Sequence, residues 1–165
     1  MSDEILPPGV DPDTRKVAVR TVRAVNEAGT RTVTWVRDYD PIVADEPDTL
    51  GGTNTGPSPL ELALVSLVSC DGVIINGVAQ AMKFDYARVE FEASGQIDVR
   101  GPKGVRGVCP YFEKVDLAIT LATDESDERF EKLQANVEFR CPIINLFRGA
   151  GVELNVTWRR AGPGQ

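Results

Sequence analysis

The sequence of 165 residues contains no histidine and only three cysteines. Without an imidazole, a Cys–His nucleophile of the kind that proteases and acyltransferases use cannot be assembled. The cysteines, at positions 70, 109 and 141, form no Cys-x-x-Cys pair, so a structural zinc site is not expected, and no metal or cofactor is predicted. A cation that assists a reactive thiol could come only from Arg or Lys.

Clustered positive charge and a secretory signal are also missing. The chain has 18 Lys and Arg against 25 Asp and Glu, a net charge of −7, and its longest basic run is Arg159–Arg160. Because phosphate contacts need clustered basic side chains, no nucleic acid partner is expected. Residues 1–14 lack a basic and an apolar segment, and their Pro, Asp and Gly content favours a flexible arm. We therefore expect a cytoplasmic protein with reduced thiols.

The longest apolar segment of the chain predicts one helix over residues 59–82. Ser58 is a good N-cap, Pro59 suits the first helical position, and Glu61 completes a capping box by accepting from the Ser58 amide. The segment is long enough to cross a membrane, but Asp71 in its interior would cost a lone spanning helix several kcal/mol. We therefore expect a buried core helix and no membrane partner.

The remaining pattern predicts strands and two further helical segments. Alternation of apolar and polar residues indicates an antiparallel hairpin near the N-terminus and more strands after the long helix. The expected strands lie in 16–25, 30–39, 85–101, 111–124 and 152–160, the helices in 126–139 and 141–151, and a loop in 40–59. This order predicts an α+β fold with antiparallel sheet, in a single domain over residues 1–165. One five-stranded sheet would cover only one side of the apolar helix, so we expect an intimate homodimer.

Cys70 lies in the middle of the long helix, at the border between a polar stripe and the apolar body. Asp71 lies away from that stripe, among Val, Leu and Ile. Cys70 is too far into the helix for the terminal dipole to activate it, so a reactive Cys70 needs an Arg or Lys cation. Two alternatives stay open: Cys70 as a small buried hydrophobic residue, and Asp71 as a carboxylate bonded to a neighbouring segment.

Cys141 directly precedes Pro142, which favours an N-cap position for Cys141. A helix N-terminus lowers the pKa of a thiol, and a thiol of low pKa is a good leaving group from a disulfide. A packed loop thiol is the alternative. Cys109 is expected to be an ordinary thiol at the start of a strand.

The stretch DEPDTLGGTNTGPSPLELALVSLVSC, which ends at Cys70, and RCPIINLF around Cys141 together resemble the OsmC/Ohr family of thiol-dependent hydroperoxide reductases. The shared marks are a Gly-Gly pair, a Gly/Asn–Pro-rich helix start, a central helical Cys, and a second Cys followed by Pro. The resemblance covers residues 16–160. It implies an OsmC-like α+β fold in which strands wrap around two long central helices of an intertwined homodimer, with the sites at the subunit interface.

The resemblance also implies the roles of the site residues. Cys70 attacks the hydroperoxide and becomes a sulfenate, and Cys141 then forms a disulfide with it that an external dithiol reduces. An Arg from the first hairpin assists the thiolate, with Arg31 the best match and Arg37 the next. A Glu near the helix start holds that Arg. The family position, ten residues before the Cys, has Leu60, and Glu61 follows it.

Two functions therefore compete at this point. The first is a peroxidase that reduces organic hydroperoxides to alcohols through the Cys70 sulfenate and the Cys70–Cys141 disulfide. The second is a non-enzymatic dimer of the same fold that binds an apolar small ligand at its interface. The cysteine pair favours the first, and the displaced Glu and the choice between two arginines favour the second.

Overall fold

The computed structural model describes residues 9–11 and 13–162 of the chain, so most of the predicted arm at 1–14 lies outside the described residues. The fold is built as two compact units, Asp11–Val65 and a unit that contains Ser66 onward, and the boundary falls inside the long helix α1 (Pro59–Met82). Each unit is described by itself. The single domain over 1–165 stays a prediction.

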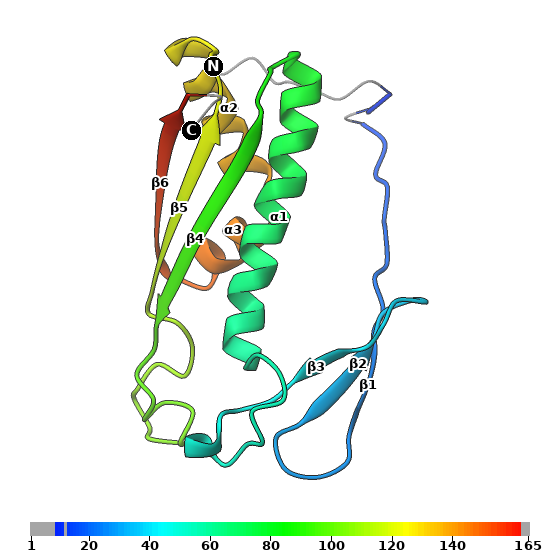
Figure 1. The fold of residues 1–165 in the computed structure, drawn as a ribbon, viewed down its shortest axis with the longest axis vertical. Helices are drawn as coiled ribbons and strands as arrows, with labels where there is room; N and C mark the ends of the chain where they lie inside the picture. The colour runs from blue at the N-terminus through cyan, green and yellow to red at the C-terminus, as the bar shows by residue number, and fades with distance from the viewer. Residues whose placement is uncertain (1–8, 12, 163–165) are drawn as a thin grey trace. The chain divides into compact units, whose positions relative to one another are not determined.

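The unit from Ser66 onward contains a three-stranded sheet in the order β4-β5-β6 (Figure 1). The strands are β4 (Arg88–Gln96), β5 (Lys114–Ala122) and β6 (Glu153–Ala161). β4 pairs antiparallel with β5, as predicted, but β6 pairs parallel to β5. The prediction of a wholly antiparallel sheet was therefore wrong for β6. The two helices between β5 and β6 return the chain to the same end of the sheet, so β6 runs parallel to β5.

These helices, α2 (Asp127–Arg140) and α3 (Pro142–Gly149), pack on the apolar face of the sheet. In Figure 1 they lie beside the sheet in orange and gold, on the same side of it as α1. Phe130 of α2 meets Trp158 of β6 edge to face, with the ring centroids 6.3 Å apart. Alternate residues of β5 fill this interior together with buried residues of the helices. They are Val115, Leu117, Ile119 and Leu121 of β5, and Leu67, Ile75, Leu133, Val137 and Ile144 of the helices. The predicted α+β class is confirmed.

Helix α1 begins and ends where the sequence predicted. The capping box is present: the Ser58 amide donates to Glu61 Oε2 at 2.7 Å, and the Glu61 amide donates to Ser58 Oγ at 3.3 Å. It is the one helix in the described ranges that is long and apolar enough to cross a membrane, by length and composition alone. One face of α1 is buried within the chain, while Val73 on another face is 71% exposed. Burial of the whole helix stays a prediction, since it depends on a second subunit.

The unit Asp11–Val65 carries its own sheet in the order β1-β2-β3, antiparallel throughout. Its strands are β1 (Arg23–Asn26), β2 (Thr32–Trp35) and β3 (Ile42–Ala44). The predicted hairpin is confirmed, but both strands are shorter than expected. The loop prediction for 40–59 was wrong at β3, because three residues are too few for an alternating pattern to be recognised.

Asp45 organises the loop between β3 and α1. Its side chain is buried, with Oδ1 accepting from Thr30 Oγ1 at 2.6 Å and Oδ2 from Thr53 Oγ1 at 2.5 Å. These hydrogen bonds, led by Thr30, hold the pKa of Asp45 well below its usual range. A Cβ on Gly52 would lie 1.7 Å from the Glu46 carbonyl oxygen, so the Gly-Gly pair is needed where the loop closes on itself.

Candidate functional site

The candidate site is built from two thiols and one carboxylate on α1 and α3. Cys70 is half-buried in the middle of α1, and Asp71, the next residue, is completely buried. Cys141 is also completely buried and stands between α2 and α3, as the C-cap of one and the N-cap of the other. The Cys141 thiol interacts with both the Asp71 carboxylate and the Cys70 side chain. The structure therefore brings the two predicted redox cysteines together.

The predicted N-cap role of Cys141 is confirmed. The Ile144 amide donates to its Sγ at 3.4 Å, and Pro142 occupies the first turn of α3. Since Sγ acts as an acceptor toward this amide, its S–H proton is left to point toward the other groups around it. The sequence of the helix start thus fixes the position of the thiol.

The expected lowering of the Cys141 pKa by the helix N-terminus was wrong. Burial raises the pKa of the Cys141 thiol, and the neighbouring Asp71 carboxylate raises it further. The Ile144 amide acts in the opposite direction but does not outweigh them. A buried thiolate beside a carboxylate would lose its solvation and gain a like charge, which explains the sign. Cys141 is therefore a protonated thiol at neutral pH.

Asp71 is the unusual group of the site, because its carboxylate is completely buried in the middle of a helix. Across residues 9–11 and 13–162, no regular hydrogen bond reaches either of its carboxylate oxygens. Burial raises the pKa of Asp71 to about 6, and the Cys141 thiol, a weak donor in contact with the carboxylate, partly offsets this. Glu138 raises the pKa through like charge, and Arg148 lowers it. The sequence signal was present as a lone carboxylate among apolar residues, but it did not reveal that the neighbouring group would be Cys141.

The other two predicted site residues, Arg31 and Glu61, belong to the unit Asp11–Val65. Glu61 is engaged in the capping box, and the Ser58 amide lowers its pKa. Arg31 lies just before β2 and lines a pocket of about 160 Å³ together with Glu27 and Trp35. The roles of Arg31 and Glu61 toward Cys70 stay predictions.

Arg37 and Cys109 are both held by local contacts. Arg37 adopts a left-handed backbone conformation, with φ of 52°, and its guanidinium lies 4.6 Å from the centre of the Tyr39 ring. Cys109 lies in the loop before β5 rather than at the start of that strand, which begins only at Lys114. Its thiol donates to the Tyr111 carbonyl at 3.5 Å.

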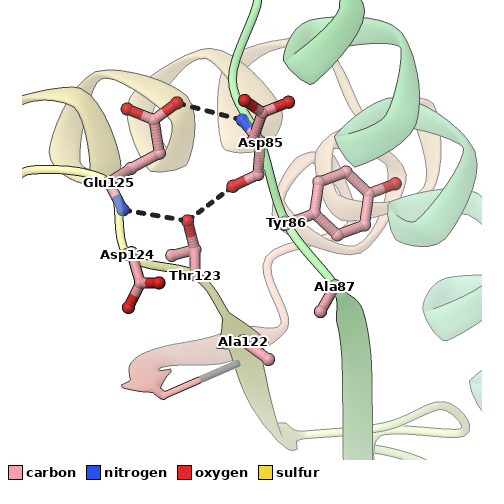
Figure 2. A pocket seen from close by; sticks show the side chains of 7 residues that line it. All are labelled: Asp85, Tyr86, Ala87, Ala122, Thr123, Asp124 and Glu125. Carbon is pink, nitrogen blue, oxygen red and sulfur yellow. Dashed lines mark hydrogen bonds between the residues drawn. The ribbon is translucent and has the colours of Figure 1, made fainter. Parts of the chain in front are cut away.

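A second pocket, of about 500 Å³, lies where β4 begins and β5 ends (Figure 2). Figure 2 shows its hydrogen bonds running between its own residues: Thr123 Oγ1 donates to the Asp85 carbonyl at 2.6 Å, and the Asp85 amide donates to Glu125 Oε1 at 2.9 Å. These bonds fasten the start of β4 to the link between β5 and α2. No group of three or more Cys, Asp or Glu side chains in the described ranges is arranged to hold a metal ion.

The sequence model of one protein family, OsmC-like protein, matches residues 52–157, which contain all of α1 and both cysteines of the candidate site. The chain therefore belongs to the OsmC-like family, as its sequence motifs predicted. No curated protein matches the chain.

Solved structures share this fold at low sequence identity. An OsmC-like protein from Mycoplasma pneumoniae is 20% identical, with a TM-score of 0.73 over 87% of this chain and 98% of that one. An organic hydroperoxide resistance protein from Elizabethkingia anophelis is 17% identical, with a TM-score of 0.69 over 90% and 100%. The organic hydroperoxide resistance protein OsmC from Legionella pneumophila is 18% identical, with a TM-score of 0.66 over 88% and 99%. At these identities the likeness shows the fold.

Proposed function

We propose that the protein is a thiol-dependent peroxidase that reduces organic hydroperoxides to alcohols. The observation that carries the proposal is that the Cys141 thiol, at the start of α3, interacts with the side chain of Cys70 in the middle of α1. The names of the Legionella and Elizabethkingia proteins with the same fold, both called organic hydroperoxide resistance proteins, support the same substrate class.

The reaction follows from the two thiols. The Cys70 thiolate attacks the distal oxygen of the hydroperoxide, the O–O bond breaks, and the alkoxide takes up a proton and leaves as the alcohol. Cys70 is then a sulfenic acid. Cys141 attacks the Cys70 sulfur, which forms the disulfide and releases water. An external dithiol reduces the disulfide by thiol–disulfide exchange.

The burial of the two thiols supports the order in which they react. Cys70 is half-buried and so can meet a substrate, while Cys141 is completely buried and has a raised pKa. A thiol that stays protonated is a poor first nucleophile, because the thiolate is the reactive species. Cys70 is therefore the attacking cysteine and Cys141 the resolving one.

The proposal includes a homodimer and a cation for the Cys70 thiolate. The exposed apolar face of α1, with Val65 49% and Val73 71% exposed, is the surface that a second subunit would cover. The apolar part of an organic hydroperoxide would lie against the same surface. We assign the cation to Arg31, with Arg37 as the alternative, and the support of that cation to Glu61. The setting is a reducing cytoplasm, where a dithiol reductant is at hand.

The test is stopped-flow consumption of cumene hydroperoxide and of hydrogen peroxide. The wild-type protein should turn over and prefer cumene hydroperoxide. Cys70→Ser should abolish turnover, whereas Cys141→Ser should consume about one peroxide per subunit and stop with Cys70 as a sulfenic or sulfinic acid. A disulfide that uses Cys109 instead would contradict the assigned pair.

A non-enzymatic protein that binds an apolar small ligand is the second candidate. The presence of Leu60 in the position that the family pattern gives to Glu favours it, as does the use of Glu61 in a capping box. A wild-type protein no faster than free cysteine with both peroxides would select this function.

A further inference from the structure

The buried carboxylate of Asp71 has no evident structural purpose. A helix position among Ile and Leu side chains would be more stable with an apolar residue, since burying a charged group without regular hydrogen bonds is costly. Within the described part of the chain, no group lies in regular hydrogen-bond geometry to its oxygens. Among the neighbouring groups, the thiol of Cys141 acts most strongly on this carboxylate. A group that is costly to keep and faces a reacting atom is a candidate for chemistry.

Cys141 needs such a partner if it is to attack the Cys70 sulfur. The thiol is buried and protonated, so its proton must leave before the sulfur becomes a nucleophile. The Ile144 amide donates to Sγ and cannot accept a proton. The chain has no histidine that could accept it. Asp71 is the buried carboxylate that interacts with this thiol.

We propose that Asp71 accepts the proton of the Cys141 thiol in the step that forms the Cys70–Cys141 disulfide and then returns it to the departing oxygen. This inference rests on the proposed peroxidase function, whose hydroperoxide supplies the oxidant. It assigns to Asp71 a catalytic role that is separate from the activation of Cys70.

The step balances in atoms and electrons. The S–H bond of Cys141 breaks, its proton goes to Asp71, and the electron pair of the sulfur forms the new S–S bond with Cys70. The S–O bond of the Cys70 sulfenic acid breaks, and the oxygen leaves as hydroxide with the electron pair of that S–O bond. Protonated Asp71 donates to the hydroxide, which leaves as water, and Asp71 is again ionised. Cys141 is oxidised and the sulfenate sulfur of Cys70 is reduced.

The surroundings of Asp71 suit a group that both accepts and donates a proton. An efficient acid–base group has a pKa close to the working pH, and burial raises the pKa of Asp71 to about 6. The groups that act on it are Cys141, Glu138 and Arg148. Glu138 accepts from Arg148 and from the Trp158 indole, so both of its carboxylate oxygens are already engaged.

The experiment compares full-length wild type with Asp71→Asn after one equivalent of cumene hydroperoxide. Quenched samples are trapped with dimedone for the sulfenic acid and mapped by mass spectrometry for the disulfide, from pH 5 to pH 8. Sulfenate formation should be unchanged in Asp71→Asn, and disulfide formation should slow by about 100-fold or more. In the wild type, the rate of disulfide formation should increase as the pH rises through about 6 and then level off. This increase with pH should be absent from Asp71→Asn.

Two variants control for a merely structural effect. Asp71→Glu keeps the carboxylate and should restore part of the rate. Glu138→Gln removes a carboxylate that is not among the groups acting on the pKa of the Cys141 thiol, so the plateau rate should stay within about twofold. Its pH midpoint should shift downward, because Glu138 raises the pKa of Asp71. If Asp71→Asn does not fold, a wild-type rate that is flat from pH 5 to pH 8 overturns the inference by itself.

Diamide distinguishes a failure of this inference from a failure of the proposed function, because it oxidises two thiols to a disulfide without a peroxide. Suppose that the wild type does not react with hydroperoxides, yet forms the Cys70–Cys141 disulfide with diamide faster than Asp71→Asn does. That result overturns the peroxidase function and supports the role of Asp71. Equal rates in wild type and Asp71→Asn, with either oxidant, overturn the role of Asp71 alone. A protein that forms no such disulfide with either oxidant overturns both.

Discussion

Replacing Asp71 by Asn should remove a pH-dependent part of the stability of the protein. The pKa of Asp71 rises from the ordinary value of 3.8 in the unfolded chain to about 6 in the folded one, mainly through burial. The native state therefore binds this proton more tightly than the unfolded state does. The resulting stabilisation is fully present below pH 3.8 and is lost as the pH rises through about 6.

The size of the effect follows from the two pKa values. A difference of about two units corresponds to about 3 kcal/mol between the acidic and the alkaline limits. Most assays cannot reach the acidic limit, because other carboxylates titrate there. Between pH 8 and pH 5, which is one unit below the folded-state pKa, the wild type should gain about 1.4 kcal/mol relative to Asp71→Asn. The buried Asn amide has its own cost, but that cost does not change with pH.

Urea unfolding at a fixed protein concentration, at pH 5, 6, 7 and 8, measures this difference. Ser66→Ala alters an exposed position of the same helix without removing a carboxylate, so it should follow the wild type at each pH. A constant difference between Asp71→Asn and the wild type over this range would refute the argument. It would mean that Asp71 is already solvated or paired in solution, for example by groups that a second subunit supplies.

Three further predictions concern the dimer, the helix start and the cation. Sedimentation equilibrium should show a wild-type dimer at micromolar concentration, and Val73→Lys should weaken it by at least tenfold, because Val73 is 71% exposed in the single chain; a wild-type monomer would contradict this. Ser58→Ala should lower the free energy of unfolding by about 1 kcal/mol through loss of the cap, without changing the peroxidase rate. Arg31→Ala should slow sulfenate formation at Cys70 by about tenfold for each 1.4 kcal/mol of lost stabilisation; a larger loss in Arg37→Ala would reassign the cation.

The sequence predicted the helices well because their signals are local. Ser58, Pro59 and Glu61 mark the start of α1, and Ser126 followed by acidic residues marks the start of α2. Pro142 does the same for α3 and places Cys141 at its N-cap. Capping depends on residues within four positions of each other, so a single chain is enough to read it.

The sheets were predicted less well because strand pairing depends on residues that are distant in the chain. The parallel pairing of Lys114 with Glu153 at the start of β5 and β6 cannot be read from the alternation inside either strand. β3 was missed since Ile42–Ala44 is too short to alternate, and its partner β2 stabilises it through backbone hydrogen bonds.

The same distinction explains what was wrong at the candidate site. The local pattern around Cys141 predicted a helix N-terminus and therefore a lowered pKa. In the folded chain the pKa of Cys141 is raised instead, because burial and Asp71, which is distant in the sequence, outweigh the dipole of a short helix. Asp71 itself was recognised as unusual, but its neighbour on α3 could be identified only from the fold.

The raised pKa of Cys141 has a consistent place in the proposed reaction. A resolving thiol that ionised easily would compete with Cys70 for the hydroperoxide and would itself be open to oxidation beyond the sulfenic acid. Complete burial keeps Cys141 protonated and away from the substrate. Its proton then has to be removed only when a Cys70 sulfenate is present, and Asp71 lies where it can do this. In this scheme the order of the two thiol steps follows from burial rather than from the sequence of the cysteines along the chain.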